Sequence, residues 1–183
     1  FYLFGRIMPK KGQWYLLEAL KHIPLNQLKG VRFTLMGGAV PGKEESLHEL
    51  ETEIDNAGLK NIVVIKNFAP NITSAMEDAD VCLVPSMMKD PFPTTVLEAM
   101  SAGRPVIATN HGGAKEAIAD CIGGLLVDPG QPAQLAKCIS QLIIEKVNIP
   151  AMGELAQKKY LSAFTIKHFN ENWSSFLVRN NFA

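Results

Sequence analysis

The stretch from Asp80 to Glu116 constrains the fold of this chain more than any other part of its 183 residues. It contains two short apolar runs, Val81 to Val84 and Pro105 to Ala108, separated by a proline-rich loop and a helical pattern. Buried strands that alternate with helices over so few residues are typical of a parallel α/β sheet. We therefore expect a strand, a loop, a helix and a second parallel strand here.

The same alternation continues in both directions along the chain. Because connections between parallel strands are right-handed, the pattern predicts a Rossmann-like, doubly wound parallel sheet of about six strands with helices on both faces. A helical C-terminal tail follows from Pro150, and residues 1–183 are expected to form a single domain. The other expected strands are Phe1 to Phe4, Val31 to Met36, Ile62 to Ile65 and Gly124 to Val127; the other expected helices are Gly12 to Ile23, Lys43 to Ala57, Asn71 to Asp78, Ala114 to Ala119 and Pro132 to Lys146.

Composition excludes several classes of protein. The 18 basic residues balance the 18 acidic ones, which argues against a nucleic-acid partner. No apolar run has the length of a membrane span, and the start of the chain shows no signal-peptide pattern. Cys82, Cys121 and Cys138 lie too far apart for a metal site, and Cys82 is expected to be a reduced thiol in the core. The chain starts within a predicted strand and without Met, so we expect it to be a piece of a longer protein.

A helix is expected to begin at Pro93, because the fixed φ of proline suits the first helical position. Thr94 and Thr95 follow, and their backbone N–H groups then point back into the preceding loop. A helix N-terminus at the carboxyl end of a parallel strand is an anion site. Asp90 in the loop and Glu98 one turn into the helix cannot share a helix face, but they can line one crevice.

The first predicted loop, Gly5 to Gly12, supplies positive charge to the same edge of the sheet. It contains Arg6, Lys10 and Lys11. Two fixed cations beside a helix N-terminus predict a diphosphate site, with Arg6 and Lys11 as its cations. Lys10 is expected to be an ordinary solvated charge.

Glu98 is the candidate for a contact with the sugar next to the diphosphate. A carboxylate accepts two hydrogen bonds, and the vicinal hydroxyl groups of a ribose offer two donors at a matching separation. The alternative is a surface glutamate, although the apolar residues that flank Glu98 indicate a largely buried helix. A buried carboxylate without a partner is costly, so Glu98 is expected to have one.

Two further patterns have competing interpretations. The run from Gly37 to Lys43 resembles a phosphate-binding P-loop, but Glu44 stands where the magnesium-binding Ser or Thr is required, which disfavours that reading. His111 could be a catalytic base oriented by Glu116, or a structural residue of a tight glycine loop; the sequence favours neither.

These residues together resemble the retaining glycosyltransferases of family 4, in particular the C-terminal, donor-binding domain of their two-domain GT-B fold. The opening GRIMPKKG is similar to the family's Gly-Arg-Leu loop that ends in Lys-Gly. The stretch from Asp90 to Glu116 is similar to its signature of two acids separated by seven residues, followed by Ala-Met, a Gly-x-Pro-Val-Ile strand and Gly-Gly-x-x-Glu. The resemblance covers nearly the whole chain.

The resemblance implies transfer of a sugar from a nucleoside-diphosphate sugar to an acceptor, with retention of the anomeric configuration. By this resemblance Arg6 and Lys11 would bind the diphosphate, Glu98 would bind the ribose, and Asp90 would contact the hydroxyl groups of the donor sugar. The backbone amides of Phe92, Thr94 and Thr95 would remain available to the ligand. It implies no metal and no cofactor besides the donor substrate. The acceptor (a glycan, a lipid or a small molecule) would bind an N-terminal domain absent from this chain. The protein would be cytoplasmic, with peripheral attachment to the membrane through that domain as a further option.

Two departures limit the resemblance. Asp90 replaces the family's usual Glu, and Pro91-Phe92-Pro93 replaces Gly-Phe-Gly, so two backbone donors are lost and the sugar pocket must differ. A nucleotide-sugar epimerase of the same fold, or a binding domain without activity, remains an alternative. A nicotinamide dehydrogenase is disfavoured because no Gly-x-Gly-x-x-Gly follows the first strand. The sequence leaves the nucleotide and the sugar open.

Overall fold

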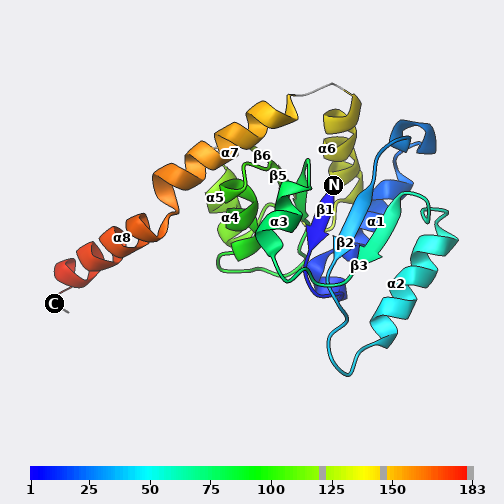
Figure 1. Cartoon of the computed structure of the whole chain (residues 1–183), viewed down its shortest axis with the longest axis horizontal. Helices are drawn as coiled ribbons and strands as arrows, with labels where there is room; N and C mark the ends of the chain where they lie inside the picture. Colours follow the sequence, from blue (N-terminus) through cyan, green and yellow to red (C-terminus); the bar gives the residue numbers. More distant parts are fainter. Residues whose placement is uncertain (120–122, 145–147, 181–183) are drawn as a thin grey trace.

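A computed structural model of the chain describes residues 1–119, 123–144 and 148–180. Its centre is a six-stranded, all-parallel sheet in the order β3-β2-β1-β4-β5-β6 (Figure 1). This confirms the predicted doubly wound fold, in which strand order reverses beside the first strand. The strands are β1 (Tyr2–Phe4), β2 (Phe33–Met36), β3 (Val63–Lys66), β4 (Cys82–Val84), β5 (Val106–Thr109) and β6 (Gly124–Val127).

Helices cover both faces of the sheet (Figure 1). One face packs against α1 (Gln13–Lys21), α2 (Glu45–Asn56) and α6 (Pro132–Ile144). The opposite face packs against α3 (Ile72–Glu77), α4 (Thr94–Ser101), α5 (Gly112–Ile118) and α7 (Ile149–Ala163). Two short 3₁₀ helices, η1 (Pro9–Lys11) and η2 (Leu25–Leu28), lie in the connections, and α8 (Ile166–Arg179) follows α7.

The strands are mostly apolar because both faces of the sheet are covered by helices. Leu3 of β1 lies opposite Leu35 and Leu83 in the parallel register, and all three belong to the core beneath α1 and α6. Their neighbours Phe4 and Cys82 point into the core of the other face. Desolvation by burial raises the pKa of the Cys82 thiol to about 12, as expected for an unreactive core cysteine.

Helix ends differ from the predictions at a few positions. Pro93 is the N-cap of α4 and not its first helical residue; its backbone is extended, with ψ 113°, and the helix begins at Thr94. Helix α5 begins at Gly112, two residues earlier than predicted. Asn71 caps α3 by accepting a hydrogen bond from the Ser74 N–H at 3.2 Å. The predicted end of α6 at Lys146 and the residue Cys121 lie outside the described residues.

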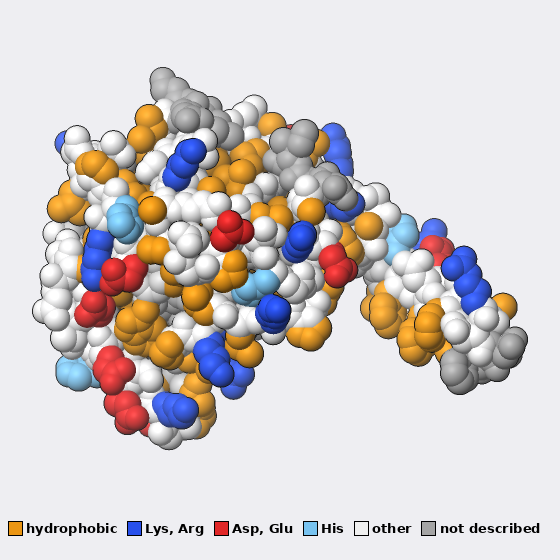
Figure 2. All heavy atoms as spheres, turned by 180° about the vertical axis from the view of Figure 1, so that it is seen from behind, with side chains coloured by type: hydrophobic (Ala, Val, Ile, Leu, Met, Phe, Trp, Pro, Cys, Tyr) orange, Lys and Arg blue, Asp and Glu red, His pale blue; other side chains and the backbone are white. Residues whose placement is uncertain are grey.

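The helical tail expected after Pro150 consists of α7 and α8. Helix α7 packs against the sheet domain, whereas α8 extends away from it and has no buried residue (Figure 1). Apolar side chains lie along one side of α8 (Figure 2). Phe169, Trp173 and Phe176 form a stacked row there, with ring centroids 6.4 and 5.5 Å apart. No helix of the described residues has the length and apolar character needed to cross a membrane.

Candidate functional site

The candidate site lies where β1 and β4 are neighbours, which is the point at which strand order reverses. The loops that follow these two strands leave the sheet at the same carboxyl-terminal edge. In parallel α/β sheets this edge is where ligands bind, because the loops diverge there and helix N-termini point toward the opening. The loops are residues 5–12 after β1 and residues 85–93 after β4.

The two loops are packed directly on each other. The Met87 N–H donates to the Lys10 carbonyl at 2.9 Å. Gly12 has a left-handed φ of 93°, and a Cβ on it would lie only 2.1 Å from the Pro85 carbonyl oxygen. The stem of Lys11 lies over Gly5, with Lys11 Cδ 3.6 Å from the place of a Gly5 Cβ. The glycine-lysine pattern of the first loop therefore holds Lys11 next to the end of β4.

A small pocket of about 70 Å³ opens between these loops and the start of α4. The structure brings together four of the predicted site residues in its lining: Lys11, Asp90, Thr94 and Thr95. The other lining residues are Phe4, Leu83, Val84, Ser86 and Pro93. The pocket therefore combines one cation, one carboxylate and a helix N-terminus, whereas the sequence predicted two cations, Arg6 and Lys11, beside that helix.

The N-terminus of α4 presents unblocked amides to this pocket. Val96 donates the first hydrogen bond of the helix, to the Pro93 carbonyl at 3.1 Å, so the N–H groups of Thr94 and Thr95 precede the helical bonding pattern. Pro93 occupies the N-cap position and supplies no side chain to cap the helix. The positive end of the helix dipole is consequently left for an anion.

Asp90 organises the loop before α4. Its Oδ1 accepts a hydrogen bond from the Phe92 N–H at 3.2 Å, and its carbonyl accepts one from the Gly113 N–H at 3.1 Å. The Phe92 amide, predicted to be available to a ligand, is therefore engaged within the loop in this structure. The Phe92 ring packs against Phe164, with centroids 5.6 Å apart, and does not line the pocket.

Arg6 and Glu98 also lie outside the lining of this pocket. The Arg6 side chain is exposed, and its backbone carbonyl accepts a hydrogen bond from Gln13 Nε2 at 2.9 Å. Glu98 is half-buried on α4, one turn beyond Thr94 and Thr95. The partner expected for its carboxylate is not found among the described residues.

The P-loop-like run has a structural explanation. A Cβ on Gly37 would lie 2.0 Å from the Gly5 carbonyl oxygen, so the glycine allows the ends of β1 and β2 to pass closely. The Glu44 carboxylate accepts the Gly42 N–H at 3.0 Å, which lowers the pKa of Glu44. The Glu44 carboxylate thus occupies a backbone amide that a P-loop would offer to a phosphate group.

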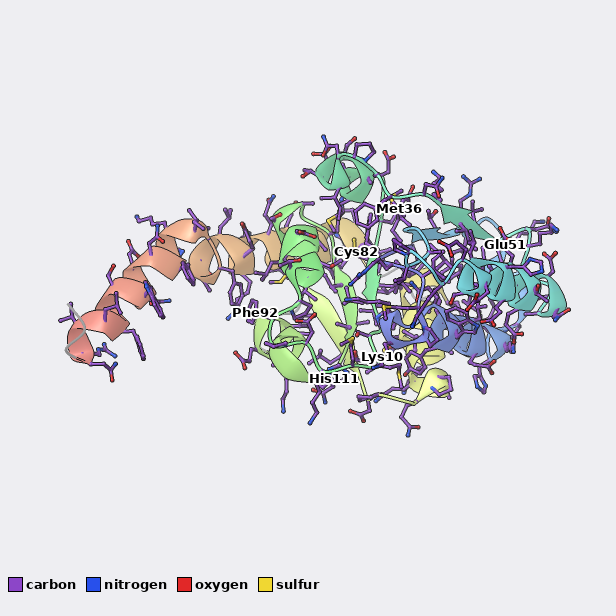
Figure 3. All side chains as sticks on the ribbon, turned by 90° about the horizontal axis from the view of Figure 1, so that it is seen from below. Lys10, Met36, Glu51, Cys82, Phe92 and His111 are labelled. Atoms are coloured by element: carbon purple, nitrogen blue, oxygen red, sulfur yellow. The ribbon has the colours of Figure 1, made fainter. Side chains whose placement is uncertain are left out.

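His111 is bonded to the backbone of the loop that contains Asp90. Its Nε2 lies 2.9 Å from the Ser86 carbonyl oxygen, and Thr109 Oγ1 donates to the same oxygen at 2.6 Å. Lys10 and His111 lie at the same edge of the molecule, with Phe92 on the side toward α7 and α8 (Figure 3). Ser86 and Thr109 were not among the predicted site residues; their only signal in the sequence is a polar residue at the end of an apolar strand or two positions beyond it.

Larger hollows lie elsewhere on the molecule. One of about 1140 Å³ opens at the amino-terminal edge of the sheet, between residues that precede the strands, such as Arg32, Ile62 and Asp80. A second, of about 580 Å³, is apolar and lies between Phe92, Phe164 and α8. The first lies at the amino-terminal edge of the sheet, opposite the edge where ligands bind in such folds, and the second has no charged residue in its lining, so topology and chemistry assign the site to the smaller pocket. Within residues 1–119, 123–144 and 148–180, no three His, Cys, Asp or Glu side chains form a group that could hold a metal ion.

The match to a family of known proteins and to solved structures places this fold among the GT-B glycosyltransferase domains. Residues 1–159 match the family described as glycosyl transferases group 1, and the chain belongs to that family. It is 31% identical to the D-inositol 3-phosphate glycosyltransferase of Paenarthrobacter aurescens (strain TC1), over 95% of this chain and 44% of that protein.

Solved structures agree with this assignment. The crystal structure of Anabaena Alr3699/HepE in complex with UDP is 30% identical, has a TM-score of 0.87, and matches 97% of this chain and 48% of that chain. The same protein has also been solved in complex with UDP-glucose. The C-terminal domain of the group 1 glycosyl transferase LpcC from Francisella tularensis is 27% identical, with a TM-score of 0.77, and matches 90% of this chain and 85% of that one. The chain thus spans about half the length of the full relatives it matches.

Proposed function

We propose that this chain is the donor-binding, C-terminal domain of a retaining glycosyltransferase of family 4. The observation that supports the proposal most directly is the pocket at the β1–β4 junction, where Lys11, Asp90 and the first amides of α4 converge. A second domain would complete the enzyme, because the chain corresponds to about half of its relatives and to most of the LpcC C-terminal domain. The acceptor, a glycan, a lipid or a small molecule, would bind that second domain.

The donor is proposed to be a UDP-sugar. Alr3699/HepE, which shares the fold at 30% identity, has been solved with UDP and with UDP-glucose. In our proposal Lys11 and Arg6 face the diphosphate, together with the N–H groups of Thr94 and Thr95. These cations and the helix N-terminus neutralise the charge that develops on the departing UDP, without a metal or other cofactor.

Asp90 and Glu98 are proposed to accept hydrogen bonds from the two sugars of the donor, which lie on either side of the diphosphate. Asp90 is placed to accept from hydroxyl groups of the sugar, since its carboxylate lines the pocket beside Lys11. Glu98 lies further along α4 and is proposed to accept from the ribose hydroxyl groups. One oxygen of Asp90 is already bonded to the Phe92 amide, which fixes the orientation of the carboxylate.

The test is the affinity of UDP for the chain and for three lysine and arginine variants, measured by titration calorimetry. Lys11→Ala and Arg6→Ala should each weaken UDP binding by about 1.5–3 kcal/mol, tenfold or more, because each removes a charge-assisted contact. Lys10→Ala is the matched control, since its side chain is exposed and it neighbours Lys11 in sequence. Equal, small losses in all three variants would indicate diffuse surface charge and contradict the proposed site.

A further inference from the structure

Ser86 connects three loops at the carboxyl-terminal edge of the sheet. It is the second residue after β4, and it is 7% exposed. Its backbone carbonyl accepts hydrogen bonds from Thr109 Oγ1 at 2.6 Å and from His111 Nε2 at 2.9 Å. The side chain of Thr109 at the end of β5 and that of His111 in the loop after it therefore converge on one carbonyl oxygen of the loop after β4.

The contact fixes the protonation of His111 at one nitrogen. A carbonyl oxygen can only accept, so Nε2 must carry a hydrogen at this distance. His111 is then a donor through Nε2, whether the ring is neutral or charged. This is a positioning contact, because the ring bonds to the backbone of the loop and does not line the pocket.

The two glycines that follow His111 hold the backbone of Asp90, further along the loop after β4. The Gly113 N–H donates to the Asp90 carbonyl at 3.1 Å. A Cβ on Gly112 would lie 2.2 Å from that carbonyl oxygen, so only glycine permits so close an approach. The segment from Ser86 to Asp90 is thus held at its first residue by Thr109 and His111, and at its last residue by the glycine pair.

On its other side Ser86 contacts the loop that contains Lys11. Ser86 Oγ lies 3.1 Å from the Lys10 carbonyl oxygen and 3.2 Å from that of Met88. The Met87 N–H donates to the Lys10 carbonyl as well. The first loop therefore has its own attachment to the Ser86 region, independent of His111.

We propose that His111 is a specificity-determining positioning residue: by holding the Ser86 carbonyl, it sets the position of Asp90 and so the affinity for the sugar part of the donor. The inference rests on the proposed function of the pocket. Because the Lys11 loop is attached through Ser86 Oγ and the Met87 N–H, and not through the Ser86 carbonyl that His111 contacts, loss of the His111 contact should leave the diphosphate contacts intact. The sugar contacts, which depend on Asp90, should weaken.

The experiment compares the dissociation constants of UDP and UDP-glucose for His111→Phe and His111→Gln. Phe keeps a ring without the donor, whereas the amide nitrogen of Gln is as many bonds from the backbone as Nε2 of His. His111→Phe should bind UDP-glucose about threefold to tenfold more weakly and UDP with unchanged affinity, the effect of one neutral hydrogen bond. His111→Gln should recover most of the loss. His48→Phe on the exposed surface of α2 is the control and should change neither constant.

Several outcomes separate this inference from the proposed function. Equal losses for UDP and UDP-glucose, no loss for either, or failure of His111→Gln to recover binding would each overturn the role of His111. Failure of the unmodified chain to bind UDP would overturn the proposed function itself. Should His111→Phe not fold, Thr109→Val removes the other donor to the same carbonyl and should show the same selective loss for UDP-glucose. A long-range ¹H–¹⁵N spectrum must place a proton on His111 Nε2; a ring protonated only on Nδ1 would refute the contact.

Discussion

At the scale of single residues, Gly12 shows how a glycine determines the spacing of the candidate site. Its φ of 93° and the 2.1 Å separation between a hypothetical Cβ and the Pro85 oxygen both require glycine. Gly12→Ala should destabilise the chain by more than about 2 kcal/mol, because it adds a steric clash to the backbone strain. Gly130 is the matched control, since it has φ 73° with open space around it. Urea denaturation of Gly130→Ala should show only the strain, about 1 kcal/mol; equal losses would exclude the clash.

Cys82 gives a residue-scale prediction for the dependence of stability on pH. Burial raises the pKa of its thiol from 9.0 to about 12, so the unfolded chain releases this proton first as pH rises. The contribution of Cys82 is complete below pH 9 and is lost between pH 9 and 12, at about 1.4 kcal/mol per pH unit. The difference in unfolding free energy between the chain and Cys82→Ala should shrink with this slope. A difference that is constant above pH 9 would contradict the shift.

Glu98 gives a residue-scale prediction for ligand choice. Glu98→Gln retains the shape of the side chain but removes the charge that would accept from the ribose hydroxyl groups. The variant should lose more affinity for UDP than for 2′-deoxy-UDP, because only the ribonucleotide has both hydroxyl groups. Calorimetric titration of both nucleotides checks this. Equal losses would show that Glu98 supports the loop and does not contact the ribose.

At the scale of elements, α7 and α8 differ in what they contribute to stability. Gly153 in α7 lies against the turn before β5, and a Cβ on it would lie 2.0 Å from the Gly103 carbonyl oxygen. Helix α8 has no buried residue, and Trp173 is 52% exposed. Gly153→Ala should therefore destabilise the chain by about 1–3 kcal/mol, whereas Trp173→Ala should cost less than about 0.5 kcal/mol. Thermal unfolding of the two variants measures the contrast; a large loss in Trp173→Ala would mean that α8 is part of the core.

Elements were predicted well because both faces of the sheet are buried. Most strands then form a short, largely apolar run, such as Leu3-Phe4 of β1, that turn residues separate from the helices. The exact start of α4 was not predictable, because proline is compatible both with the N-cap and with the first helical position. Sequence also could not show that the Phe92 amide is bonded to Asp90, or that His111 reaches Ser86. The first contact depends on the local conformation of one loop, and the second on how the loops after β4 and β5 meet in space.

At the scale of the whole molecule, the proposal that this chain binds the donor and a second domain binds the acceptor predicts what the chain does alone. A donor domain by itself cannot position an acceptor or exclude water, and these effects account for much of the rate of a transferase. The chain should bind UDP-glucose but show no sugar transfer and at most trace hydrolysis. Joined to its native N-terminal half it should transfer with retention, which NMR of the product establishes. Inverted product would exclude family 4, and interconversion of two nucleotide-sugars without an acceptor would favour an epimerase.

In that complete protein Asp90→Ala should separate turnover from nucleotide affinity. The variant should reduce kcat strongly while leaving the affinity for UDP nearly unchanged, because UDP lacks the sugar that Asp90 is proposed to contact. Steady-state kinetics together with UDP titration make the comparison. A parallel loss of both would mean that Asp90 maintains the fold of the loop.

The central position of β1 has a consequence for the order in which the chain folds. Strands β1 to β3 come from residues 2–66, and β4 to β6 from residues 82–127, so each half of the sheet is contiguous in sequence. The halves are joined through β1 and β4, where Tyr2 pairs with Cys82 and Leu3 with Leu83. That pairing spans about eighty residues, and contacts between distant segments carry the largest loop-closure cost in folding. We therefore expect the seam between the two halves to form late, so that the pocket above it appears only once both halves have folded.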